Sequence, residues 1–253
     1  MESYPHRGFM LDTGRKFFPV RAILDLLTVL HEHHFNVFHW HIYDAESFPL
    51  LWPADGGLTD KLGILVYPET DMPGHSDIWG LWKKDLIVGK PDLKRPQAQL
   101  DIRPQTQPHI YSHITTLIST IDRNNDNQLF ESFLHWLRSL CPNKSRIIWD
   151  DALTDAGKTI ALDSDWIIQT WHNGVTQDVL DRGHRVIVSE SDTFYIGNAD
   201  ADKLLAFRFP DHSNVLGFEV VWFTSTGDDP WDFRRSWVME PIRAASKIRR
   251  RRY

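Results

Sequence analysis

Short apolar stretches alternate with amphipathic segments along most of the chain. Runs rich in aromatic and β-branched residues predict buried strands, and apolar residues at helical spacing predict helices. The expected strands cover seven ranges: 9–12, 35–42, 64–67, 146–149, 166–171, 185–189 and 215–222. The expected helices cover 20–34, 109–120, 129–140, 175–182 and 231–248. Alternation of strands and helices indicates a parallel α/β sheet.

A closed (β/α)8 barrel of the TIM type has eight strands and typically needs about 250 residues. The chain has 253 residues, which predicts a single domain over 1–253. The alternation of strands and helices fails over 109–140, where two helices follow each other without a strand. In addition, no convincing helix separates the second strand from the third. We therefore expect an incomplete barrel of about seven strands, with one strand missing between 64–67 and 146–149.

Composition narrows the class of protein. Charged residues make up 25% and the formal net charge is -6, so nothing favours a nucleic-acid partner. No apolar run is long enough to cross a membrane, and Cys141, the single cysteine, excludes an intrachain disulfide. Residues 1–5 do not have the pattern of a signal peptide, so we expect a cytoplasmic protein. Nothing in the sequence calls for a cofactor, and the sequence leaves the oligomeric state open.

Polar residues gather where several expected strands end. Asp44 and His75 follow the second and third strands. The carboxyl ends of parallel barrel strands are where active sites form. Trp149, Trp171 and Trp222 lie in or at the ends of separate apolar runs. Aromatic planes pack well against the C–H faces of sugar rings, so this set suits a carbohydrate pocket.

Three motifs carry a family resemblance. They are Arg7-Gly-x-x-Leu-Asp12-x-x-Arg15, His39-Trp-His-Ile-x-Asp44 with Ser47-Phe-Pro49, and Pro68-Glu-x-Asp-Met-Pro-Gly-His75. Weaker matches follow in order: Ile148-Trp149, Gln169-Thr-Trp171, Phe194-Tyr195, and Leu216-Gly-x-Glu219 with Trp222. The chain resembles the catalytic domain of glycoside hydrolase family 20, the β-N-acetylhexosaminidases.

The resemblance implies an activity and roles for individual residues. Enzymes of this family remove terminal N-acetylglucosamine or N-acetylgalactosamine with retention, and the substrate's own acetamido oxygen is the nucleophile. The implied partner is an amino-sugar glycan or a chitooligosaccharide. Arg7 would hold sugar hydroxyls with Asp44 beside it, and His75 would lie near the acid. Trp149, Trp171 and Trp222 would wall the pocket, and Tyr195 would donate to the acetamido oxygen.

One departure from the family bears directly on catalysis. The family supplies its acid from a Gly-Gly-Asp-Glu segment, and no Asp-Glu pair occurs anywhere in this chain. Thr224 also stands where the family usually has a sugar-binding glutamate. The catalytic residue is therefore unknown. Asp150 is the best substitute, because closing the gap would bring its strand beside the third, and Glu69, Asp71 and Glu190 are the others. We expect little or no turnover.

Several alternatives stay open at this stage. The chain could be a catalytically inactive sugar-binding remnant, or an open sheet whose exposed edges promote aggregation. It could also be a metal-dependent barrel hydrolase, with His39, His41, His75 and Asp150 as ligands, although the sugar-hydrolase motif explains the histidines without a metal. Individually, Arg7 and Asp44 could form a plain ion pair, His75 could cap a loop, and Tyr195 could belong to the core.

Overall fold

A computed structural model of the protein describes most of the chain. The described residues are 4–44, 64–69, 71–72, 74–82, 84–88, 99–101, 131, 134–135, 138–139, 142–154, 160–225, 228 and 232–248. The expected helix at 109–120 lies outside them. The described residues within 129–140 are helical, as expected. No helix in the described part of the chain is long and apolar enough to span a membrane.

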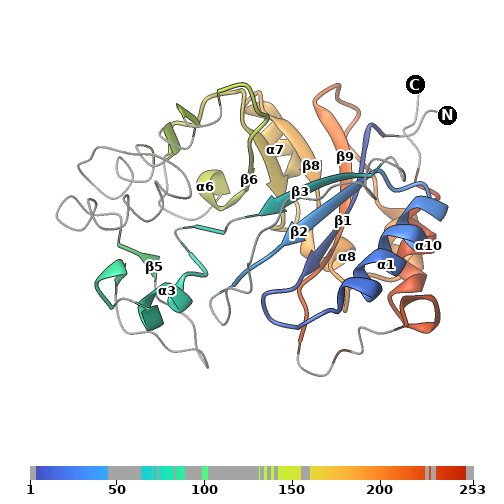
Figure 1. Ribbon diagram of the computed structural model, residues 1–253. Helices are drawn as coiled ribbons and strands as arrows, with labels where there is room; N and C mark the ends of the chain where they lie inside the picture. The colour runs from blue at the N-terminus through green and yellow to red at the C-terminus, as the bar shows by residue number, and fades with distance from the viewer. Residues whose placement is uncertain are drawn as a thin grey trace.

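Seven parallel strands form one curled sheet (Figure 1). Their order is β3-β2-β1-β9-β8-β7-β6. The strands are β1 (His6–Asp12), β2 (Val37–His41), β3 (Leu65–Glu69), β6 (Ile147–Trp149), β7 (Ile167–Thr170), β8 (Arg185–Val188) and β9 (Val215–Trp222). Each overlaps one of the seven expected strands. Among the described residues β3 and β6 are the two edges, so the expected incomplete α/β barrel, interrupted after its third strand, is confirmed.

Short helices and 3-10 turns lie between and after the strands in the described part of the chain. They are α1 (Val20–Glu32), α3 (Asp77–Trp82), α6 (Asp151–Thr154), α7 (Thr176–Asp181), α8 (Ser191–Phe194), α9 (Ala201–Ala206) and α10 (Met239–Ala245), with the 3-10 turns η1 (Lys84–Leu86) and η2 (Phe233–Arg235). Helix α1 follows Pro19 and buries Leu26, Leu27 and Leu30 along one stripe. Helices α1 and α10 lie on the same side of the sheet (Figure 1).

The last helix is shorter than expected. Residues 231–248 contain η2 and α10 instead of one continuous helix. The Asp232 carboxylate accepts from the Arg235 amide and so favours a separate turn. Pro241 lies in the first turn of α10, where its missing N–H costs nothing. A second difference is a small antiparallel pair, β4 (Ile87–Val88) and β5 (Gln99–Leu100), apart from the main sheet.

The two faces of the sheet carry different chemistry. Phe9, Leu11 and Phe38 belong to the apolar core cluster that includes the buried residues of α1. The alternate residues Asp12, His39 and His41 are also buried, yet polar. Because strand side chains alternate between faces, this pattern places an apolar layer under the helices and a polar layer inside the curl.

Two glycines allow β1 and β9 to approach closely. At Gly217, with φ of 154°, an added Cβ would lie 1.7 Å from the His6 carbonyl oxygen. At Gly8, an added Cβ would lie 2.5 Å from Cγ of Glu219. Gly217 therefore lets the two strand backbones approach, and Gly8 makes room for the Glu219 side chain inside the curl.

Candidate active site

The carboxyl ends of β1, β2 and β3 align three ionisable side chains. The register pairs Asp12 with His41 and His41 with Glu69. Registered neighbours project from the same face of a sheet, so all three point into the curl. Asp12 and His41 are fully buried, and the Glu69 side chain is 12% exposed. This end of the sheet is where barrel proteins build their sites.

Arg15 joins two buried carboxylates above β1. Its guanidinium lies 2.8 Å from Asp12 Oδ2 and 2.6 Å from Asp44 Oδ2. Asp12 also accepts from the backbone N–H groups of Gly14 and Arg15, which fixes the turn that follows β1. The Arg15 guanidinium lies over the Phe223 ring, 5.0 Å from its centroid. Arg15 thereby compensates two charges and borders the aromatic part of the site.

His41 lies between two carboxylates. Its Nδ1 is 2.5 Å from Glu69 Oε2, and its Nε2 is 2.8 Å from Asp44 Oδ2. Burial alone would lower the pKa of His41, but the neighbouring carboxylates of Glu69 and Asp44 raise it well above the ordinary value. We therefore assign a cationic imidazolium that donates from both ring nitrogens.

Imidazoles and carboxylates continue in alternation through the inside of the curl. Glu219 accepts from His6 at 2.7 Å and from His39 at 2.9 Å. The other nitrogen of His39 is 3.1 Å from Glu69 Oε2. Burial would lower the pKa of His39, but Glu219 and Glu69 raise it to about 9. We name this set the histidine–carboxylate chain: His6, Glu219, His39, Glu69, His41, Asp44 and His75.

Asp44 and His75 form the outer end of that chain. Burial would raise the pKa of Asp44, but hydrogen bonds from His41 and His75, and the charge of Arg15, lower it well below the ordinary range. His75 Nδ1 is 3.1 Å from Asp44 Oδ2, and its side chain is 45% exposed. The hydrogen bond with Asp44 raises the pKa of His75. His75 has a φ of 49°, a left-handed conformation that tertiary contacts must hold in place.

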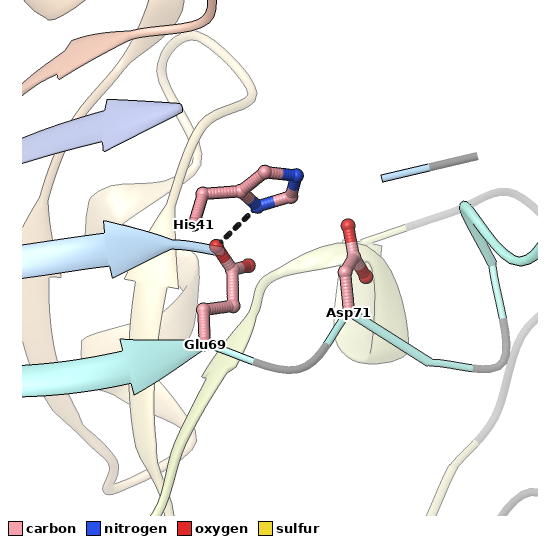
Figure 2. A group of neighbouring side chains, drawn as sticks. All are labelled: His41, Glu69 and Asp71. Carbon is pink, nitrogen blue, oxygen red and sulfur yellow. Dashed lines mark hydrogen bonds and ion pairs between the residues drawn. The ribbon is translucent and has the colours of Figure 1, made fainter. Parts of the chain in front are cut away.

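Asp71 borders the histidine–carboxylate chain without belonging to it. Figure 2 shows its carboxyl beside the His41 ring, on the segment that follows β3. One Asp71 oxygen is 3.7 Å from His75 Nε2. Burial and the negative charge of Glu69 raise the pKa of Asp71 to about 6. Asp71 is therefore easier to protonate than an ordinary aspartate.

Aromatic rings form one wall beside these charges. The Trp149 ring stacks near His39, with centroids 6.1 Å apart, and its Nε1 donates to Glu69 Oε1 at 2.7 Å. The Phe223 ring lies 5.3 Å from His41, 5.6 Å from Tyr195 and 6.4 Å from Trp149. Burial and nearby carboxylates raise the pKa of Tyr195, so its hydroxyl stays neutral. Fixed charges beside aromatic faces suit a polar ligand that also has an apolar face.

A metal centre was one alternative for these residues. His41, Glu69 and Asp71 each offer a ligand atom within 4.8 Å of the others. However, both ring nitrogens of His41 lie directly against carboxylate oxygens, at 2.5 Å from Glu69 and 2.8 Å from Asp44, which leaves little room for an ion between them. The four ligands expected from the sequence also include Asp150, which instead accepts hydrogen bonds from Trp171 and His172. The donor chemistry therefore favours an ion-pair network.

The family model of glycosyl hydrolase family 20, catalytic domain, matches residues 4–62 and 105–215. The chain belongs to this family. It is 26% identical to a beta-hexosaminidase of Emericella nidulans over 76% of this chain and 44% of that protein. It is 37% identical to the beta-hexosaminidase subunit beta of Felis catus over 34% of this chain and 20% of that protein. The family 20 chain thus spans less than half the length of either relative.

A solved structure supports the fold of the family 20 domain. The chitobiase of Flavobacterium johnsoniae superposes with a TM-score of 0.73 at 19% identity, covering 96% of this chain and 48% of that one. Similarity at this level of identity concerns the fold alone. It agrees with the curled parallel sheet described above.

Four of the residues expected in the family 20 site do come together. Asp44, His75, Trp149 and Tyr195 all lie at the carboxyl end of the sheet, around Phe223 and His41. Their role in substrate binding stays a prediction. Trp171 lies at the same end, directly after β7, where its indole donates to Asp151 and its ring packs on His172.

Arg7 does not join this group. Its side chain donates to the backbone carbonyls of Tyr4 and His34, near the amino end of β1. Five residues of extended strand separate Arg7 from Asp12, or roughly 17 Å at about 3.3 Å per residue. The expected pairing of Arg7 with Asp44 is therefore wrong. The motif's second arginine, Arg15, takes that place, because the turn after β1 carries it back over the strand ends.

Trp222 also lies elsewhere. It is 1% exposed and packs against Phe18, Phe233 and Trp237 under the helices. The expectation that it walls the pocket is wrong by one residue, because Phe223 is the neighbour that faces the site. Counting in steps of two from Glu219 would have found Phe223. Thr224 is buried and donates to Asp12.

Asp150 is unsuited to the role of substitute acid. It is fully buried, and Oδ1 accepts from the Trp171 amide at 2.7 Å. Its Oδ2 accepts from Thr154 and from His172 Nδ1, each at 2.8 Å. These contacts tie the start of α6 to the end of β7. A carboxylate held in this way cannot reach a leaving oxygen, so the geometry argues against Asp150 as the acid.

Proposed function

We propose that this chain is a hexosaminidase-like glycoside hydrolase domain that binds a terminal N-acetylhexosamine of a glycan or chitooligosaccharide. The observation that carries the proposal is the juxtaposition of Arg15, Asp44 and His75 with the rings of Trp149 and Phe223. Fixed donors and acceptors would orient sugar hydroxyls, and the rings would pack on the apolar face of the sugar. Membership of family 20 supports the same class of ligand.

Turnover in this site is expected to be slow. Hydrolysis of a glycoside needs a carboxylic acid at the leaving oxygen, and a positioned acid is worth roughly 10²–10⁴-fold in rate. The chain has no Asp-Glu pair in which one carboxyl could protonate while the other orients the acetamide. The absence of this pair favours, as a second candidate, a domain that binds amino sugars without hydrolysing them.

Two measurements test the proposal. Calorimetric titration with N-acetylglucosamine and with glucose should give binding of the first and markedly weaker binding of the second. The Asp44→Asn variant should weaken this binding, because Asp44 holds Arg15 and His75 in place. Asp211→Asn, at an exposed position, should keep it. Hydrolysis of an aryl N-acetylglucosaminide then separates slow turnover from binding alone. Equal affinity for both sugars, or none, would contradict the proposal.

A further inference from the structure

A glycosidase site needs a carboxyl group that is both reachable and able to hold a proton. Most carboxyls here fail one condition. Asp12, Asp44 and Glu219 are fully buried and paired with Arg15 or histidines. Glu69 accepts from two imidazoles and an indole. Such pairing holds a carboxylate in its charged form.

Asp71 differs in exposure and in pairing. Its side chain is 19% exposed, and among the described residues its carboxyl makes a single ionic contact, at 3.7 Å from His75 Nε2. The segment that carries it is held, because the buried Tyr43 hydroxyl donates to the Asp71 backbone oxygen at 2.9 Å. Asp71 therefore combines a fixed backbone position with a partly exposed carboxyl.

The charges around Asp71 favour its protonated form. Burial and the Glu69 carboxylate raise the pKa of Asp71, Asp44 raises it further, and His75 and His41 oppose this rise. The net result is a pKa of about 6. The ionisable groups that act on this carboxyl come from the ends of β2 and β3, the segments after them and the residue after α8: His41, Tyr43, Asp44, Glu69, His75 and Tyr195.

We propose that Asp71 is the proton donor of this site and carries what turnover the chain has. The inference rests on the proposed function. The Asp71 carboxyl gives its proton to the leaving oxygen as the bond from the anomeric carbon to that oxygen breaks. The electron pair of that bond stays on the leaving oxygen, while the substrate's acetamido oxygen bonds to the anomeric carbon. Water then adds to that carbon, restores the acetamide and returns one proton to Asp71.

Leaving-group dependence gives the sharpest test. A phenyl N-acetylglucosaminide needs protonation of its leaving oxygen, whereas a dinitrophenyl one barely does. Asp71→Asn should lower kcat on the phenyl substrate by roughly 10²–10⁴-fold and on the dinitrophenyl substrate by less than about tenfold. Asp71→Glu should restore part of the phenyl activity. Asp211→Asn is the control and should behave as wild type on both substrates.

A pH profile provides a second readout. The wild-type rate on the phenyl substrate should fall as the pH rises through about 6, because the donor loses its proton. Asp71→Asn should abolish that fall and leave N-acetylglucosamine binding intact. Equal losses on both substrates, no loss on either, or no wild-type turnover would overturn the proposal. Loss of sugar selectivity in wild type would instead refute the proposed function.

Discussion

The two faces of the sheet are built from the same strands, yet the outer face is apolar and the inner face carries paired charges. In β2, Phe38 points into the apolar layer beneath the helices, while His39 and His41 point into the curl. The outer face contributes stability through area removed from water. Among the described residues, Arg15 and the histidine–carboxylate chain pair the buried charges of the inner face with one another, and such pairs are costly to break. The contrast separates residues that hold the fold from residues that set the chemistry.

The neighbouring residues Trp222 and Phe223 test this contrast most strongly. Trp222→Ala should lower the free energy of unfolding by about 3–5 kcal/mol, because it opens a cavity in the apolar layer. Phe223→Ala should cost less stability but weaken N-acetylglucosamine binding. Urea unfolding and calorimetry measure the two effects. Equal destabilisation, or weaker binding in the folded Trp222 variant, would show that the faces are not separable in this way.

The pH dependence of stability should come from the inner face. The folded-state pKa of His39 is raised to about 9, above the ordinary value of 6.5. The protonated His39 ring therefore stabilises the fold fully below pH 6.5, and this stabilisation is lost as the pH rises through about 9. At about 1.4 kcal/mol per pKa unit, His39 contributes on the order of 3 kcal/mol.

Unfolding free energies at pH 6 and pH 10 check this prediction. His39→Gln removes the titrating group and keeps an amide donor. The variant should therefore lose less unfolding free energy between pH 6 and pH 10 than wild type does. Wild-type stability that stays constant or increases over this range would contradict the assignment.

The two arginines of the first motif should have unequal effects on binding. Arg15→Ala removes the cation shared by Asp12 and Asp44 and should weaken N-acetylglucosamine binding by about tenfold or more, as expected for hydrogen bonds to charged groups. Arg7→Ala acts at the other end of β1 and should change the affinity by less than about twofold. A reversed order in the titrations would restore the role that the family resemblance implies for Arg7.

The smallest effect on turnover is expected at Asp150. Asp150→Asn should leave the rate and its pH profile within about twofold of wild type. It should still lower stability by about 1–3 kcal/mol, because it disturbs buried hydrogen bonds to Trp171 and His172. Hydrolysis of an aryl N-acetylglucosaminide and thermal unfolding measure the two quantities. Loss of turnover without loss of stability would make Asp150 a candidate for the catalytic acid again.

Local pattern was sufficient for the strands but not for the direction of each site residue. All seven strands were predicted within a few residues, because each apolar run has the period of its element. Arg7 was misplaced because it lies at the amino end of β1, far from the strand ends that carry the site. Trp222 was misplaced because its side chain lies on the outer face of β9. Asp71 was named only as a possible substitute, because its raised pKa depends on Glu69 and on burial, both set by tertiary structure.

The hydrogen bond from Trp149 to Glu69 joins β6 to β3, the two edges of the described sheet. The sheet therefore resembles a split ring whose ends meet through one indole and one carboxylate. Strands β1 and β9 have paired neighbours on both sides, whereas β3 and β6 each have one in the described sheet. Amide hydrogens should consequently exchange slowest in β1 and β9 and fastest at the split. The site straddles this split, so local opening of the ring would change the distance between its aromatic wall and its charges.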